Sequence, residues 1–252
     1  IKEFKDSIDN PEFVKKMEIF GAFENDELRG VIATREKHHI ALFFVHENYH
    51  RRGIGKELYN YVKKLNTPQK LEQFAKEVIE KHGHIDYLIN NALPLTKGID
   101  ECTYEEFQYA LSVGITAPFY LAKLFIHHFA KGAAIINITS SRDRMSQPQT
   151  ESYTAAKGGI AALTHALAIS LAGKVRVNSI SPGWIDTSYT IHKGSDASQQ
   201  PVGRVGNPMD IANMVLFLCS NKAGFITGEN ICIDGGMTHQ MIYHGDNGWK
   251  LE

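Results

Sequence analysis

Short apolar runs alternate with longer segments of mixed polarity through most of the chain, from about residue 67 onward. Four runs have the length of buried strands and lie at 85–91, 133–140, 175–181 and 229–234. Segments that repeat apolar residues with helical spacing lie at about 69–82, 104–131, 151–172 and from 208 onward. Strands that alternate with helices in this way form a parallel sheet with helices on both faces. The pattern therefore predicts an α/β fold for this part of the chain.

The pattern is different before residue 67. Residues 20–23 and 29–34 read as two strands joined by a turn, and 39–45 (HIALFFV) is an apolar run of strand length. A basic loop with two glycines follows and leads into a helix with apolar residues on one side. Proline is favoured at the first turn of a helix, so Pro68 marks the start of a new one. We therefore expect two parts that meet near residue 66, with one continuous sheet through both as an alternative.

Composition and charge narrow the classes of function. A formal net charge of -1, with a pI near 6.9, provides no basic surface for nucleic acid or for an anionic membrane. No apolar run reaches the ~18 residues that a membrane-spanning helix needs. Three cysteines at irregular spacing and twelve scattered histidines suggest neither a disulfide framework nor a metal site. We expect a cytoplasmic protein that binds no metal, membrane or nucleic acid.

The clearest candidate chemistry lies in the stretch 135–159, IINITSSRDRMSQPQTESYTAAKGG. It reads as a buried strand, a polar loop and a helix that carries Tyr153 and Lys157 four positions apart, so both side chains share one helix face. A lysine ammonium beside a phenol stabilises the phenolate, which suits proton exchange with a carbonyl or an alcohol near neutral pH. Ser140, at the end of the strand, would hold the same substrate oxygen by a hydrogen bond.

Tyr59 and Lys63 repeat this spacing in a segment that is typical of a solvated helix face, so spacing alone does not identify an active site. Three further motifs supply the context: IDYLINNA (85–92), VRVNSISPGWIDT (175–187) and FITGENICIDGG (225–236). In this order, with the stretch above, they resemble the short-chain dehydrogenase/reductase family over about residues 67–245. The resemblance implies a Rossmann-like sheet, NAD or NADP as cofactor, and hydride transfer to or from a small carbonyl compound or secondary alcohol.

The resemblance also implies roles for individual residues. Tyr153 is the general acid and base, Lys157 supports it and contacts the nicotinamide ribose, and Ser140 orients the substrate oxygen. The implied cofactor contacts in this part of the chain are Tyr153, Lys157, Asn90, Ala92, Pro182, Gly183, Ile185 and Thr187. Two positions depart from the family pattern, because Leu93 replaces a glycine and Gly114 replaces the asparagine that completes the proton relay. The polar segment 186–206 corresponds to the lid over the substrate and favours small polar substrates.

A second resemblance covers about residues 22–66. The strands, the R-R-G-I-G loop and the helix after it are similar to the central part of a GNAT-type N-acetyltransferase, whose loop binds the pyrophosphate of acetyl-CoA at a helix N-terminus. This segment stands where the dehydrogenase family has its first half, including the glycine-rich dinucleotide turn. Gly53 and Gly55 match that turn, although its first glycine is missing. Arg51 and Arg52 would pair with phosphate oxygens.

The expected fold class is therefore a Rossmann-like parallel sheet whose first half is replaced by an acetyltransferase-like antiparallel meander plus strand-loop-helix. In this hypothesis residues 39–45 take the place of the first dehydrogenase strand and pair in parallel with 85–91. Three functions are compatible with these features: an NAD(P)-dependent oxidoreductase, an acyl-CoA-binding or N-acetyltransferase-like protein that uses acetyl-CoA, and a catalytically impaired chimera of the two families. The dehydrogenase resemblance also implies a homo-oligomer, either a dimer or a tetramer.

Overall fold

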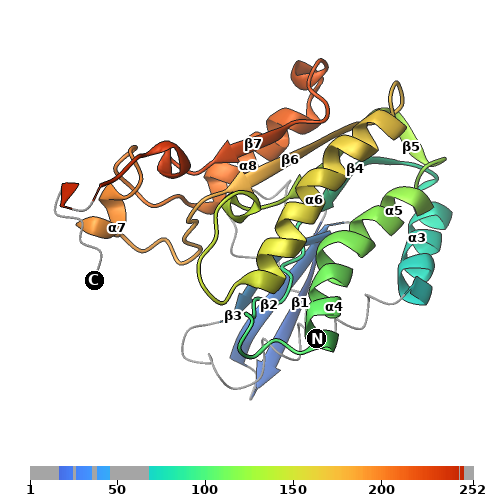
Figure 1. The fold of residues 1–252 in the computed structure, drawn as a ribbon. Helices are drawn as coiled ribbons and strands as arrows, with labels where there is room; N and C mark the ends of the chain where they lie inside the picture. Colours follow the sequence, from blue (N-terminus) through green and yellow to red (C-terminus); the bar gives the residue numbers. More distant parts are fainter. Residues whose placement is uncertain (1–16, 25–26, 36–38, 46–67, 244, 247–252) are drawn as a thin grey trace. The chain divides into compact units, whose positions relative to one another are not determined.

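The computed structural model describes the backbone of residues 17–24, 27–35, 39–45, 68–243 and 245–246, and the side chains of the last two ranges (Figure 1). The chain divides into two compact units, residues 1–84 and 85–252. The loop that holds Arg51, Arg52, Gly53 and Gly55 lies outside the described residues. Its contact with a pyrophosphate therefore stays a prediction.

The described residues of the first unit form an antiparallel sheet and one helix. The strands, in the order β1-β2-β3, are Met17–Glu24, Glu27–Arg35 and His39–Val45. Each strand pairs with its neighbour in sequence, as short connections favour. The parallel pairing expected between residues 39–45 and 85–91 is not formed among the described strands, since β3 pairs with β2 in a separate sheet. Helix α3 (Pro68–His82) begins at the predicted proline.

The second unit is built on a four-stranded parallel sheet, which confirms the α/β prediction. In the order β4-β5-β6-β7 its strands are Ile85–Asn90, Phe129–Ile138, Arg176–Pro182 and Asn230–Ile233. Strand β5 begins earlier than the apolar run at 133–140 because Phe129 is already aligned with Ile85 of β4. Parallel strands carry their connections across the faces of the sheet, so the carboxyl ends of all four strands lie at one edge.

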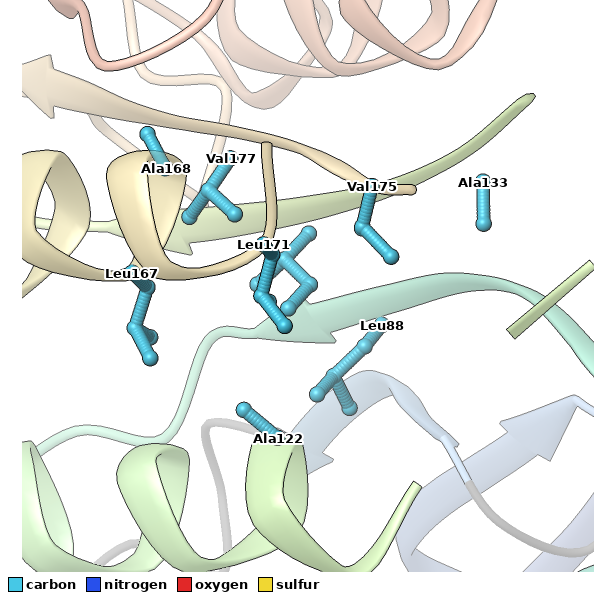
Figure 2. Close-up of a cluster of buried hydrophobic side chains, with 9 residues drawn as sticks. Leu88, Ala122, Ala133, Leu167, Ala168, Leu171, Val175 and Val177 are labelled. Atoms are coloured by element: carbon cyan, nitrogen blue, oxygen red, sulfur yellow. The ribbon is translucent and has the colours of Figure 1, made fainter. Parts of the chain in front are cut away.

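Two apolar layers hold helices on the two faces of this sheet (Figure 1). Successive residues of a strand point to opposite faces, so Ile135 belongs to one layer and Ile136 to the other. Helices α5 (Ala117–Leu124) and α6 (Glu151–Ser170) cover the first face, and α8 (Pro208–Cys219) covers the second. Figure 2 shows the first layer, which includes Leu88, Ala122, Leu167, Leu171 and Val177.

The helix expected over residues 104–131 begins as predicted but ends earlier, at Leu124, and contains a π-helical turn. Helix α4 (Tyr104–Leu111) and α5 are joined by a π-helical turn, η2 (Ser112–Thr116), and the chain enters β5 soon after α5 ends. A Cβ atom at Gly114, within η2, would lie 2.7 Å from the Cβ atom of Ala156 on α6. The two helices therefore approach each other too closely for a side chain at Gly114, which explains why glycine stands there. Single π-turns inside helices are frequent at functional sites.

Candidate active site

Polar residues gather where β5 ends and α6 begins. Ser140 lies two residues after the end of β5 at Ile138, and the short helical turn η3 (Ser141–Asp143) follows it. Tyr153 lies in the first turn of α6, and Lys157 lies one turn further along. The carboxyl edge of a parallel sheet is the usual place for a ligand in α/β folds. The structure thus brings the three predicted catalytic residues to this edge, although their roles stay predictions.

Tyr153 and Lys157 are neighbours on α6. The Nζ atom of Lys157 lies 5.5 Å from the centroid of the Tyr153 ring, and the lysine is only 4% exposed. Nζ donates a hydrogen bond of 2.7 Å to the carbonyl oxygen of Ile138, the last residue of β5. An ammonium group carries three donors, and this is the one hydrogen bond it makes to the described residues. The other two N–H groups can therefore hold hydroxyl groups of a ligand.

Burial also changes the proton affinity of Lys157. Removing the ammonium from water disfavours its charged form, which lowers the pKa of Lys157 from 10.5 to about 8. At neutral pH the group is still charged, so a buried cation lies beside the phenol. A buried lysine with a shifted pKa next to a second titratable group is typical of functional sites.

Ser140 is held in extended backbone geometry, with φ of -168° and ψ of 158°. Its side chain is largely buried, and its Oγ atom accepts a hydrogen bond of 3.2 Å from the backbone N–H of Arg142. A serine hydroxyl can accept and donate at the same time. The hydroxyl hydrogen is therefore not consumed by this bond and can be offered to a substrate oxygen.

Asp143 fastens η3 to the sheet. Its Oδ2 atom accepts hydrogen bonds from Ser181 Oγ of β6, at 2.9 Å, and from Asn230 Nδ2 of β7. Arg144 donates two further bonds to the same carboxylate, at 2.8 and 3.1 Å. Burial by itself raises the pKa of Asp143, but the bonds from Arg144, Ser181 and Asn230 outweigh it and leave the pKa below its ordinary value. This role of Asp143 was not predicted from the sequence. The feature that indicates it is the presence of polar residues, Ser181 and Asn230, within otherwise apolar strands.

Arg142 is a second residue to which the sequence analysis gave no role. Its Cζ atom lies 5.5 Å from the centroid of the Tyr153 ring, which is within the range of a cation–π contact. Its Nη2 atom donates to Oε1 of Gln147 in the same loop. Together with Lys157, Arg142 places a second positive charge beside the phenol.

Asn90, a predicted cofactor contact, has a structural task as well. Its Nδ2 atom donates to Oδ1 of Asn137 on β5 at 2.8 Å, and Nδ2 of Asn137 donates to Oγ1 of Thr164 on α6 at 2.9 Å. This chain of side chains links β4, β5 and α6, so the Asn90 amide is largely committed to the fold. Ala92 and Leu93, which follow the strand, are exposed, and Leu93 is 66% exposed. They are accessible to a ligand at this edge.

The other predicted cofactor residues follow the end of β6. Pro182 is the last residue of this strand, and Ile185 forms an isolated parallel bridge with Gly206. Thr187, just beyond, is exposed. These three residues therefore lie along one edge of the sheet, as predicted from the motif order, and their contact with a cofactor stays a prediction.

Gly183 meets the chain that leaves β7. Its N–H donates to the carbonyl oxygen of Ile233 at 3.0 Å, and a Cβ atom at this position would lie 2.6 Å from the Cβ atom of Asp234. The Asp234 carboxylate accepts hydrogen bonds from the backbone N–H groups of Gly236 and Thr238, at 2.9 and 2.7 Å. In the structure Asp234 thus closes a turn and holds it against Gly183.

The described part of the chain contains neither a metal site nor a membrane-spanning helix. No group of three or more histidine, cysteine, aspartate or glutamate residues is arranged there to hold a metal ion. None of the helices described has both the length and the apolar character needed to cross a bilayer.

Comparisons with known proteins match two families. The family model described as enoyl-(acyl carrier protein) reductase, of the short-chain dehydrogenase/reductase type, matches residues 51–238. The model described as acetyltransferase (GNAT) domain matches residues 1–83. Both resemblances that the sequence suggested are thereby confirmed, and the two matched ranges overlap over residues 51–83, which include α3.

Several relatives are similar over the same region. An uncharacterized oxidoreductase of Thermotoga maritima is 44% identical over 187 residues, which cover 69% of this chain and 73% of the relative. An apo SCOR enzyme of Clostridium thermocellum is 48% identical, with a TM-score of 0.68 over 75% of this chain and 76% of its own. A 4-hydroxyisoleucine dehydrogenase solved with NADH is 28% identical, with a TM-score of 0.63 over 70% of this chain and 79% of its own.

Proposed function

Because the chain belongs to the short-chain dehydrogenase/reductase family, we propose that it transfers hydride between the nicotinamide of NAD or NADP and a small carbonyl compound or secondary alcohol. The observation that supports this most directly is the buried Lys157 ammonium 5.5 Å from the Tyr153 ring, at the carboxyl edge of a parallel sheet. The members of this family are oxidoreductases. The class of substrate and the residues that act on it are the part that we propose.

In the proposed mechanism each catalytic residue has one task. The Tyr153 hydroxyl gives a proton to the carbonyl oxygen during reduction and takes it back from the alcohol during oxidation. The Ser140 hydroxyl donates a hydrogen bond to the same oxygen and holds it near the phenol. Lys157 stabilises the phenolate that forms, because a buried ammonium acts strongly in a low dielectric. The nicotinamide, when bound, supplies or accepts the hydride.

The residues present fit such a cofactor. The Lys157 ammonium has two N–H groups without an acceptor among the described residues, and ribose hydroxyls are suitable acceptors. Asn90, Ala92, Pro182, Gly183, Ile185 and Thr187 would line the cofactor along the strand ends. Arg51, Arg52, Gly53 and Gly55 would hold its pyrophosphate, since both matched families place this group at a loop before a helix N-terminus. The relative solved with NADH supports a nicotinamide cofactor.

A first experiment tests the cofactor and the phenol together. Titration with NADH and with NADPH, followed by protein fluorescence and by melting temperature, should reveal binding of at least one of them. Tyr153→Phe should then lower kcat by orders of magnitude and leave the binding of that cofactor nearly unchanged. Tyr104→Phe is a matched control, because Tyr104 is 73% exposed on α4. Equal turnover in Tyr153→Phe and wild type would refute the assigned role.

A second candidate function rests on the match of residues 1–83 to the acetyltransferase family. In this case Arg51 to Gly55 would hold the pyrophosphate of acetyl-CoA, and the chain would bind acyl-CoA or transfer an acetyl group. The same titration with acetyl-CoA separates the two functions. A catalytically impaired chimera would give no response to any of the three ligands.

We also propose that the chain is cytoplasmic and that it forms a homo-oligomer. Cys102, Cys219 and Cys232 are unpaired, which suits a reducing, cytoplasmic setting. A homodimer or homotetramer is supported by exposed apolar side chains on α5 and α6, namely Phe119 at 46% and Ile169 at 78% exposure. Light scattering on the purified chain would give the oligomeric state directly.

A further inference from the structure

Arg142 lies where it can contact a substrate held by the proposed catalytic residues. It follows Ser140 by two positions, and its backbone N–H is bonded to the Ser140 hydroxyl at 3.2 Å. Its guanidinium carbon is 5.5 Å from the centroid of the Tyr153 ring. One residue therefore contacts both groups that would hold the reacting oxygen, one through its backbone and the other through its side chain.

The charge of Arg142 distinguishes it from its neighbour Arg144. Arg144 is neutralised by the Asp143 carboxylate, which accepts two of its N–H groups at 2.8 and 3.1 Å. Within the described residues, the Arg142 guanidinium instead bonds to the neutral side chain of Gln147. A guanidinium carries five donors in a planar fork that matches a carboxylate. Arg142 thus offers a positive charge and unused donors beside the phenol.

The backbone around Arg142 is fixed by the sheet. The next residue, Asp143, is bonded to Ser181 of β6 and to Asn230 of β7. Its backbone N–H also donates to the carbonyl oxygen of Ser140 at 2.9 Å. Because Asp143 is held in this way, the backbone of Arg142 has a defined position from which its guanidinium reaches the phenol. A preorganised donor contributes more to binding than one that must be ordered by the ligand.

We propose that Arg142 binds a carboxylate of the substrate, and that the substrates of this enzyme are therefore α- or β-keto acids and the corresponding hydroxy acids. This inference rests on the proposed function and adds the chemical class of the substrate. The short distance between the guanidinium and the Tyr153 ring places the carboxylate close to the carbonyl that is reduced. Lys157, the second cation at the phenol, makes the site still more favourable for an anion.

The test compares acids with their neutral esters. Pyruvate, 2-oxobutyrate and acetoacetate are reduced with the preferred cofactor, each beside its methyl ester, by wild type, Arg142→Gln, Arg142→Lys and Lys131→Gln. Lys131→Gln removes the same charge from an exposed residue at the start of β5, far along the strand from Ser140. We expect Arg142→Gln to lower kcat/KM for the best acid at least tenfold and to change it less than twofold for the ester. Arg142→Lys should recover part of the loss, and Lys131→Gln should behave as wild type.

Calorimetry separates this inference from the proposed function. The best acid, or acetoacetate if no acid is turned over, is titrated into wild type and Arg142→Gln with the cofactor present. Weaker acid binding in the variant supports the carboxylate site even if the enzyme proves inactive. The inference is overturned if no acid is preferred to its ester, if Arg142→Gln affects acid and ester equally, or if acid binding is the same in both proteins. Turnover of neutral ketones would leave the proposed function intact in each of these cases.

Discussion

Asp143 and Asp186 lie in polar segments that follow β5 and β6 of the same sheet, and their carboxylates have different hydrogen-bond partners. Asp143 accepts hydrogen bonds from Ser181 and Asn230, which are 38 and 87 positions away in sequence. Asp186 accepts three bonds, all from Ser188 and Thr190, two and four positions further along. The Asp143 carboxylate therefore ties its segment to the sheet, whereas the bonds of the Asp186 carboxylate stay within its own segment. That segment meets the chain after β7 elsewhere, where the N–H of Val202 donates to the carbonyl oxygen of Gly235 at 3.2 Å.

The difference separates two tasks of an active site. In the proposed mechanism Ser140 and Arg142 must keep a defined geometry, and the Asp143 anchor gives it to them. The dehydrogenase resemblance assigns residues 186–206 to a lid, and lids are drawn from the less stable parts of a fold. The bonds that the Asp186 carboxylate accepts all come from residues 188 and 190, so they can move with that stretch of chain. We therefore expect Asp143→Ala and Asp186→Ala to have unequal effects on stability and on turnover.

The largest effect is expected for Asp143→Ala. This change removes the acceptor of the partly buried Asn230 amide, and an unpaired buried donor costs about 1–3 kcal/mol in the free energy of unfolding. Ser181 keeps Oδ1 of Asn230 as an acceptor, and the exposed Arg144 can bond to water. The substitution also releases η3, and a small misplacement of catalytic groups can lower the rate about hundredfold. Urea unfolding and kcat should show both losses together. A variant of unchanged kcat would mean that η3 keeps its position without the carboxylate.

The second prediction is that the buried Lys157 makes the free energy of unfolding depend on pH. The pKa of Lys157 is about 8 in the fold and near 10.5 when the chain is unfolded. Between these values the unfolded chain binds more protons, so the free energy of unfolding rises as the pH increases from about 8 to 10.5, by at most about 3 kcal/mol. The rise should be missing in Lys157→Met.

The measurement is the difference in unfolding free energy between wild type and Lys157→Met at a series of pH values. Other groups that titrate in this range contribute equally to both proteins and cancel in the difference. Below pH 8 the difference should be constant, since the buried ammonium is then charged in both states. A difference that stays flat across the whole range would show that the lysine is not desolvated in the folded protein.

A third, smaller effect tests how tightly α6 is held beside the site. At Gly114 a Cβ atom would lie 2.7 Å from the Cβ atom of Ala156, so Gly114→Ala should reduce the free energy of unfolding by roughly 1–3 kcal/mol. Gly158→Ala is the matched control, because its new Cβ would meet nothing nearer than the backbone oxygen of Asp143 at 3.9 Å. Alanine is the better helix former, so this control should be neutral or slightly stabilising. Equal destabilisation in both variants would contradict the close packing at Gly114.

The sequence predicted the elements of the sheet better than the contacts of the site. The four apolar runs became the four parallel strands, and the helix expected from residue 208 onward is α8, which Asn207 caps by accepting the N–H of Met209. Local composition is sufficient for such features. The π-helical turn between α4 and α5, which packs against α6 at Gly114, was missed because no local pattern indicates it.

The same limit applies within the site. The spacing of Tyr153 and Lys157 is local, so helical geometry alone predicts that they are neighbours. The tasks of Arg142 and Asp143 depend on β6 and β7, whose order in the sheet is fixed by the whole fold. For the same reason the sequence did not distinguish Asp143 from Asp186, since each is a polar residue in a polar loop after an apolar strand.

The smallest effect, and the sharpest test of the comparison, is therefore expected for Asp186→Ala. Bonds from the Ser188 hydroxyl and from backbone N–H groups lower the pKa of Asp186 to about 2, yet all of them lie within the segment itself. His192, whose Nε2 atom is 3.6 Å from the Asp186 carboxylate, belongs to the same segment. Removing the carboxylate should loosen the segment, raise KM a few-fold and speed its cleavage by a protease, while kcat and the urea midpoint stay close to wild type. Should Asp186→Ala instead lose as much stability and kcat as Asp143→Ala, the lid would be anchored as firmly as η3, and the division of tasks between the two segments would not hold.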